Sequence, residues 1–217
     1  MDHTDNKNEL LAQQQRQTRT GRWKLFAVLA VCAAPLIFSY LTYYVIKPTG
    51  RTNYGELIDP RAHPIPVLGA TSLDGKPTEL TAWQGKWLML KAGPSACAKP
   101  CMDQMFAMRQ LRAMQGKEME RIERVWLITD QAPLETVLIR ELDGMRMLRA
   151  SAAAVSGWLP HTAGAPLESS IYLIDPLGHL MMRFPPPPAG ATEAQAVEHY
   201  AKIKKDIAKV LKASAIG

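Results

Sequence analysis

The sequence predicts an α/β domain that follows a single N-terminal transmembrane helix. One observation is an uncharged, apolar run of 22 residues at positions 25–46, long enough to cross about 30 Å of hydrocarbon as a helix. Another is the alternation of buried-type strands with a helical stripe in the rest of the chain. The third is the composition, because 47% hydrophobic and 21% charged residues in 217 positions support one sizeable core.

The apolar run has the features of an uncleaved membrane anchor rather than a signal peptide. Trp23 precedes the run and three tyrosines lie toward its end, where aromatic residues belong in a membrane interface. The run is too long for the apolar part of a signal peptide, and no small-x-small cleavage site follows it. We therefore read residues 25–46 as a single-pass anchor.

Basic residues set the expected orientation of this anchor. More of them lie before the span than over a similar distance after it, which favours a cytoplasmic N-terminus. The two sets are Arg16, Arg19, Arg22 and Lys24 before the span, and Lys47, Arg51 and Arg61 after it. In a bacterium this places the anchor in the inner membrane and the C-terminal part in the periplasm, where thiol pairs can oxidise.

The chain is expected to divide into four parts. They are a disordered cytoplasmic tail at 1–24, the transmembrane anchor at 25–46, a linker at 47–66 and a periplasmic domain at 67–217. The formal net charge of +6 contains no block of like charges and no basic–aromatic pattern. Lipid headgroups of the inner membrane explain this charge as well as nucleic acid does, so we expect no nucleic-acid partner.

The first half of the domain predicts a hairpin, a strand and a helix. Residues 67–80 contain two short strand patterns around an Asp74-Gly75 turn. The apolar run at 87–92 is typical of a buried strand. Apolar residues then recur at helical spacing as far as about Gln115, which predicts a helix.

The second half predicts a further strand, a helix, a hairpin and a last helix. Residues 124–130 form another central-strand pattern, and 133–142 can form a helix. The region from there to Gly164 is poorly patterned, whereas 170–184 has the form strand, turn, strand. The final segment is an amphipathic surface helix with Val197 on its predicted apolar face.

This order of elements is that of a thioredoxin-like fold. A helix between two buried strands implies a parallel pair, and the closing hairpin adds antiparallel strands. Two cysteines, Cys97 and Cys101, then lie between the first core strand and its helix, where proteins of this fold keep their active site.

The two cysteines have a spacing that suits several kinds of chemistry. Pro100 fits the first turn of a helix, so Cys97 and Cys101 straddle a helix N-terminus, whose dipole lowers the pKa of a thiol. Lys99 adds positive charge nearby. In a helix their Cα atoms lie about 6 Å apart, within disulfide range, and two thiolates also suit Cu(I). A redox couple, a metal clip, a structural disulfide and two buried thiols all remain open.

The stretch from about Asn53 to Lys212 resembles the Sco (SenC/PrrC-like) family of membrane-anchored copper chaperones and redox proteins. The Cys97-Ala-Lys-Pro-Cys101 motif matches the family's C-x-x-x-C. Further matches are NYGEL, LDGKPTELTAWQGKWLMLKAG, WLITDQAP and IYLIDPLGHL. The resemblance implies a thioredoxin fold, copper as the metal, and cytochrome c oxidase subunits or their assembly factors as partners.

This sequence departs from the family at the copper site. The family's third copper ligand is a histidine about five residues before the aromatic residue matched by Tyr172, and that count reaches Leu167. Ala98 and Met102 stand where proline is usual or frequent. The chain is therefore identified as a divergent member that keeps the dithiol but lacks the histidine, a change that weakens Cu(II) binding more than Cu(I) binding or redox work.

These observations predict a protein that assists oxidase assembly by thiol–disulfide exchange or transient Cu(I) handling. We expect Cys97 to attack and Cys101 to resolve, with the same two residues holding copper. The alternatives are a non-catalytic anchored module with a structural disulfide, and a general thiol–disulfide oxidoreductase without copper. Whether any turnover makes the protein an enzyme stays open.

Several other methionine, histidine and aspartate side chains could have either a structural or a functional role. We expect Met102, Met105 and Met108 to be core rather than thioether ligands. His161 is a weak candidate for a substitute metal ligand. Asp130 is expected to cap the following helix rather than to tune a thiol.

Overall fold

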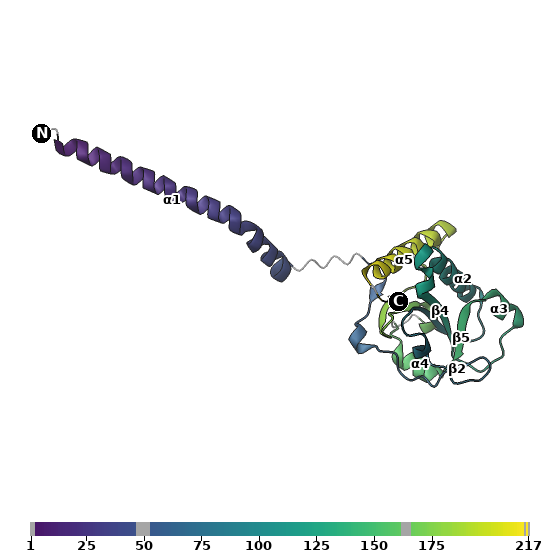
Figure 1. The fold of residues 1–217 in the computed structure, drawn as a ribbon. Coiled ribbons are helices and arrows are strands. Elements are labelled where there is room, and N and C mark those ends of the chain that lie inside the picture. The colour runs from purple at the N-terminus through teal and green to yellow at the C-terminus, as the bar shows by residue number, and fades with distance from the viewer. Residues whose placement is uncertain (1–2, 47–52, 162–165, 215, 217) are drawn as a thin grey trace. The chain divides into compact units, whose positions relative to one another are not determined.

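The computed structural model describes residues 3–46, 53–161, 166–214 and 216, and it divides into two units (Figure 1). The first unit is Met1–Arg51 and the second is Thr52–Gly217. Positions 1–2 of the predicted tail and 47–52 of the predicted linker lie outside the described residues.

The first unit is one long helix. Helix α1 spans His3–Leu41 and ends in a π-helical turn at Thr42–Ile46. Its segment Arg22–Val45 is long and apolar enough to cross a membrane, and the large apolar side chains there are exposed, as side chains that contact lipid must be. The helix also covers most of the predicted tail, a stretch without proline that is rich in good helix formers.

The second unit is built on a seven-stranded sheet in the order β1-β7-β6-β3-β4-β5-β2. At its centre, β3 (Trp87–Gly93) runs parallel to β4 (Ile122–Ile128) and antiparallel to β6 (Ile171–Ile174). The outer strands are β5 (Met145–Arg149), β7 (Leu180–Phe184), β1 (Glu56–Leu57) and β2 (Thr71–Ser72). The predicted parallel pair and closing hairpin are therefore present.

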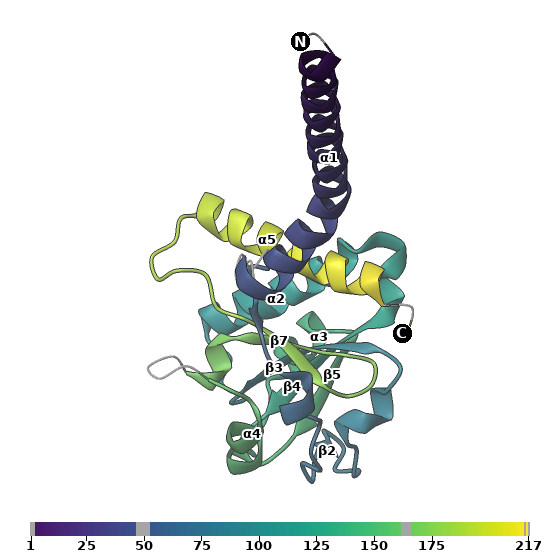
Figure 2. The ribbon, with the colours of Figure 1, turned by 90° about the vertical axis from the view of Figure 1, so that its left-hand side faces the viewer.

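Helices cover both faces of this sheet (Figures 1 and 2). On one face lie α2 (Lys99–Ala113), the short α3 (Thr136–Glu141) and the amphipathic α5 (Glu193–Ala213). On the other lies α4 (Ala152–Trp158). The architecture is the predicted thioredoxin-like arrangement, with α2 leaving the carboxyl end of the central strand.

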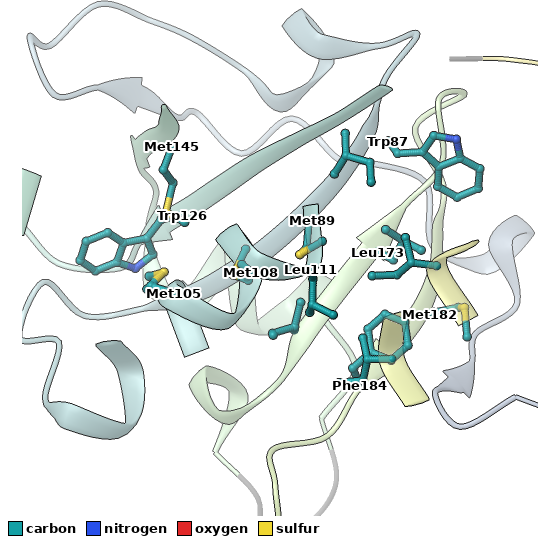
Figure 3. Close-up of a cluster of buried hydrophobic side chains, with 14 of the residues drawn as sticks. Trp87, Met89, Met105, Met108, Leu111, Trp126, Met145, Leu173, Met182 and Phe184 are labelled. Atoms are coloured by element: carbon teal, nitrogen blue, oxygen red, sulfur yellow. The ribbon is translucent and has the colours of Figure 1, made fainter. Parts of the chain in front are cut away.

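Two hydrophobic clusters lie on the two faces, because alternate residues of a strand point to opposite sides. Met89 of β3 and Trp126 of β4 belong to the cluster under α2, whereas Leu90 and Val125 belong to the cluster under α4. Figure 3 shows methionines of α2 packed among side chains of the sheet. Met105 and Met108 are fully buried, which confirms their expected place in the core, and Met102 is half-buried.

Several elements differ from the sequence-based expectation. β5 and α4 occupy the region that lacks a clear pattern, and the predicted hairpin at 67–80 shrinks to β2 and an isolated bridge between Thr71 and Pro77. On α5 the buried face includes His199 and Asp206, while Val197 is exposed.

The part of the predicted linker that the structure describes, from residue 53 onward, is fixed to the domain. The backbone N–H groups of Tyr54 and Gly55 donate to Asp206 Oδ2 over 2.6 and 2.9 Å, and the Tyr54 hydroxyl lies 2.7 Å from His199 Nδ1. Asp206 is buried on α5, so its carboxylate needs these donors. The segment then continues into β1, which pairs with β7.

Candidate functional site

Cys97 and Cys101 form a disulfide beyond the carboxyl end of β3. Their Cα atoms are 5.2 Å apart, as the four-residue spacing across a helix start predicts. Cys97 precedes the N-cap residue Ala98, and Cys101 belongs to the first turn of α2. Both cysteines are partly buried against the core cluster under α2.

The start of α2 offers backbone N–H groups and no capping side chain. Pro100 occupies the first turn, where its missing N–H costs nothing. The N–H groups of Cys101 and Met102 both donate to the Ala98 carbonyl, over 2.9 and 3.1 Å. The positive end of the helix dipole therefore lies at the disulfide and will stabilise a thiolate after reduction.

The charge of Lys99 is less available than the sequence indicates. Its ammonium group lies 3.1 Å from both carboxylate oxygens of Asp103, one turn further along α2. This exposed ion pair offsets the positive charge next to the dithiol. The helix terminus is thus the main local source of positive potential.

Asp130 holds the segment that leads into Cys97. The Ser95 N–H and hydroxyl both donate to Asp130 Oδ2 at 3.0 Å, and Arg149 Nη1 lies 3.7 Å from Oδ1. Burial alone would raise the pKa of Asp130, but the hydrogen bonds from Ser95 and from the Ala132 backbone, together with the charge of Arg149, outweigh it, so the pKa is lowered. The expected helix-capping role is wrong, because the N-cap residue of α3 is Glu135.

A cleft of about 610 Å³ opens beside Cys97. One wall is the segment before and within the start of α2, and the other is the segment leading into α3. Its lining residues are Ser95, Ala96, Cys97, Ala98, Met102, Ala132, Pro133, Glu135, Val137, Leu138 and Glu141. Cys97 is part of this lining and Cys101 is not, so Cys97 is the cysteine that borders the cleft.

A buried lysine under the site is a feature that sequence reasoning missed. Lys91, in the middle of β3, donates from Nζ to Gln104 Oε1 on α2 and to the Glu168 carbonyl. Gln104 in turn donates to the Ser169 carbonyl. Burial lowers the pKa of Lys91 to about 8. A lysine within the apolar run WLMLKAG is the signal that could have found this network.

Leu167, the counterpart of the family's histidine, lies in a 3₁₀ turn at Leu167–Ser169 and packs against the cluster under α4. The Tyr172 hydroxyl donates to the Pro160 carbonyl at 3.1 Å. His161 is exposed, with Nδ1 3.3 Å from the Leu159 carbonyl. Within the described residues, no group of three or more His, Cys, Asp or Glu side chains is placed to hold a metal ion. The structure thus joins Cys97 to Cys101 without bringing His161 into a metal-binding group with them.

Comparisons with known proteins agree with this architecture. A family described as transmembrane-like, thioredoxin-like, C-terminal domain matches residues 87–214, and a transmembrane-like N-terminal domain matches residues 15–45. A comparison with curated proteins gave no match.

Similar solved structures include Sco1 proteins. Yeast Sco1 with copper bound has a TM-score of 0.50 at 14% identity, over 76% of this chain and 97% of that chain. Apo Sco1 from Thermus thermophilus has a TM-score of 0.50 at 17% identity, over 76% of this chain and 98% of that chain. The chain belongs to the transmembrane-like, thioredoxin-like family, and its domain has a Sco-like thioredoxin fold.

Proposed function

We propose that this protein is a membrane-anchored thiol–disulfide exchange protein that assists the assembly of cytochrome c oxidase. The observation that carries the proposal is the Cys97–Cys101 pair at an uncapped helix N-terminus, with Cys97 facing a cleft. The oxidase as the target rests on the resemblance to Sco proteins, and the periplasmic location rests on the charge asymmetry around the anchor.

The exchange begins with the reduced dithiol. The Cys97 thiolate attacks one sulfur of a partner's disulfide, forming a mixed disulfide and releasing the partner's other sulfur as a thiolate that takes up a proton. Cys101 then loses its proton and attacks Cys97, which releases the partner's second thiol and closes the Cys97–Cys101 bond. Two electrons pass to the partner. An external dithiol then reduces the Cys97–Cys101 bond with two electrons of its own and becomes a disulfide, which regenerates the dithiol.

Cu(I) is a second cargo that the reduced site suits. Two thiolates are soft donors and favour Cu(I), and Leu167 supplies no third ligand for Cu(II). Titration of the reduced full-length chain against a competing Cu(I) chelator should give one bound ion, which Cys97→Ser removes. The His161→Ala variant should bind equally well, and a weaker affinity would identify His161 as a further ligand.

The oxidase role is tested in cells that produce a Cys97→Ser/Cys101→Ser chain in place of the natural one. We expect cytochrome c oxidase activity and its copper content to fall while the amount of chain in the membrane stays constant. Cys32→Ser is the matched control, because Cys32 is an exposed thiol of the anchor segment outside the site. Unchanged oxidase activity in the double variant would refute the role in assembly.

Leu167, at the position of the family's third copper ligand, also supports a second function, that of a general thiol–disulfide oxidoreductase that does not handle copper. That alternative predicts exchange with many disulfide substrates and normal oxidase copper in the double-serine cells. The same experiment therefore separates the two functions.

A further inference from the structure

A second pocket, of about 300 Å³, adjoins the dithiol cleft. The two hollows share Met102 and Glu141 in their linings. Three arginines, Arg109, Arg124 and Arg140, line this second pocket, which we call the arginine pocket. They come from three separate elements, α2, β4 and α3, so the fold rather than one charged run of sequence brings them together.

Arg124 occupies a position where a core residue is expected. It lies on β4 between Ile122 and Trp126, two residues from each, and therefore on the sheet face that α2 covers. Its side chain is buried, and its Nη2 donates a hydrogen bond to the Asp143 carbonyl over 2.9 Å. No carboxylate of the described chain lies within ion-pair distance of it, although a buried guanidinium is costly without one.

The surroundings of Arg124 are themselves positive. Burial lowers its pKa first, and the nearby charges of Arg112 and Arg109 lower it further, while Asp143 and Glu123 act in the opposite sense. Arg109 and Arg140 are exposed, and within the described part of the chain neither has a carboxylate at ion-pair distance. Since Glu141 is the acidic residue in the lining, three guanidinium groups face one carboxylate.

The rim of the arginine pocket adds an apolar contact. Phe106 lies in its lining on α2 and is 59% exposed. The neighbouring cleft has the opposite charge, because Glu135 and Glu141 line it next to Cys97. A segment that crosses both hollows is therefore best matched by a neutral or basic residue near its cysteine and an acidic residue further along.

We propose that the arginine pocket binds a carboxylate side chain of the protein whose cysteine reacts with Cys97. The inference rests on the proposed exchange function and names the chemistry of its partner. Guanidinium groups bind carboxylates with paired, charge-assisted hydrogen bonds, which gives orientation as well as affinity. A protein segment fits better than a free anion, because the shared lining of the two hollows lets one extended chain occupy both.

The test compares two disulfide-linked peptide dimers as substrates of the reduced full-length chain in detergent micelles. The peptides differ only by glutamate or glutamine four residues after their single cysteine. We expect the glutamate peptide to react about tenfold faster at low salt, the size of effect that a charged hydrogen bond gives, and to lose this advantage in high salt. Arg140→Gln and Arg109→Gln should remove the preference.

The matched control is Arg61→Gln, which removes the same charge from an exposed arginine outside the pocket. It should keep the preference for the glutamate peptide. Both pocket variants change exposed side chains, so folding does not depend on them as it does on the buried Arg124.

Equal rates with the two peptides would refute carboxylate binding in the arginine pocket while leaving the exchange function intact. If neither peptide reacts, the exchange function fails.

Carboxylate binding in the arginine pocket is then tested by fluorescence anisotropy of cysteine-free peptides with the Cys97→Ser/Cys101→Ser chain. Equal affinities for the glutamate and glutamine peptides would refute it. Equal rates together with Arg140-dependent binding of fluorescent short-chain phosphatidylglycerol would assign the pocket to a lipid headgroup and refute a protein partner.

Discussion

Lys91 shows how one side chain can connect the site to three parts of the fold. Its ammonium group links β3 to Gln104 of α2 and to the Glu168 carbonyl just before β6. Gln104 lies one turn beyond Cys101, so the network fixes the helix that carries the dithiol. Burial of the amine destabilises its charged form, and the two acceptors offset part of that cost.

Replacement of Lys91 by methionine should change how stability depends on pH. The ordinary pKa of 10.5 applies to the unfolded chain, and the folded value is about 8, so the unfolded chain binds more protons between these values. The free energy of unfolding of the natural chain therefore gains up to about 1.4 kcal/mol per pH unit over that range. Lys91→Met lacks this gain and leaves two acceptors unpaired, which costs about 1–3 kcal/mol at pH 7.

Chemical denaturation of the full-length chain in micelles at pH 7 and pH 9.5 measures both effects. The natural chain should be the more stable at pH 7, and the difference should widen at pH 9.5. Lys205→Met, on the exposed side of α5, should show the same difference at both values. A Lys91→Met deficit that does not change with pH would contradict the lowered pKa.

For single residues, the sequence predicts an interaction when the two partners lie close together along the chain. Cys97 and Cys101 are predictable because four residues and Pro100 define a helix start. Asp130 and Arg124 are not, because their partners, Ser95 and Asp143, lie 35 and 19 positions away along the chain. Only the fold decides that Asp130 holds Ser95 instead of capping α3.

Helix α2 contributes residues to the disulfide, to the hydrophobic core and to the arginine pocket. Its first turn carries Cys101, one face buries Met105 and Met108, and Arg109 reaches the arginine pocket. Buried methionines adapt to irregular gaps in a core, which suits a helix that packs on a twisted sheet. The position of the dithiol therefore depends on this packing.

Met108→Ala should lower the free energy of unfolding by about 2–5 kcal/mol, because it removes a fully buried side chain and leaves a cavity. Met114→Ala is the matched control, since Met114 is 43% exposed at the end of the same helix and should cost about 0.5 kcal/mol or less. Denaturation of both variants with the disulfide intact provides the measurement. Equal losses would contradict the core role of Met108.

Whole elements were predictable where periodicity extends over several residues. β3, α2, β4, the β6–β7 hairpin and α5 all follow from apolar runs or helical stripes. β5 was missed because arginines interrupt its short run, MRMLR, and α4 because seven residues give too little periodicity. β1 and β2, with two residues each, are defined by pairing with distant strands.

The molecule as a whole joins an apolar N-terminal helix to a folded domain with a disulfide between Cys97 and Cys101. Such an arrangement is that of a domain with a membrane anchor. The sequence predicts the anchor from length and composition alone. It does not predict that residues from Tyr54 onward attach to α5, because Asp206 is 152 positions away.

The side of the membrane is a separate prediction. Alkaline phosphatase fused to the C-terminus should be active, because the basic residues before the span favour a cytoplasmic N-terminus and the enzyme needs an oxidising compartment. Replacing Arg16, Arg19, Arg22 and Lys24 with glutamine should lower that activity by weakening the orientation signal. A fluorescent cytoplasmic reporter at the same position, with inactive phosphatase, would contradict a periplasmic domain.

The reduction potential of Cys97–Cys101 at pH 7 tests most directly whether the cysteine pair is a working redox couple. Equilibration of the full-length chain with graded dithiol–disulfide buffers, followed by alkylation of free thiols, gives this value. We predict a potential above about −300 mV, since the helix terminus stabilises the reduced form as a thiolate. A potential well below about −300 mV would mark a structural disulfide and contradict the exchange function.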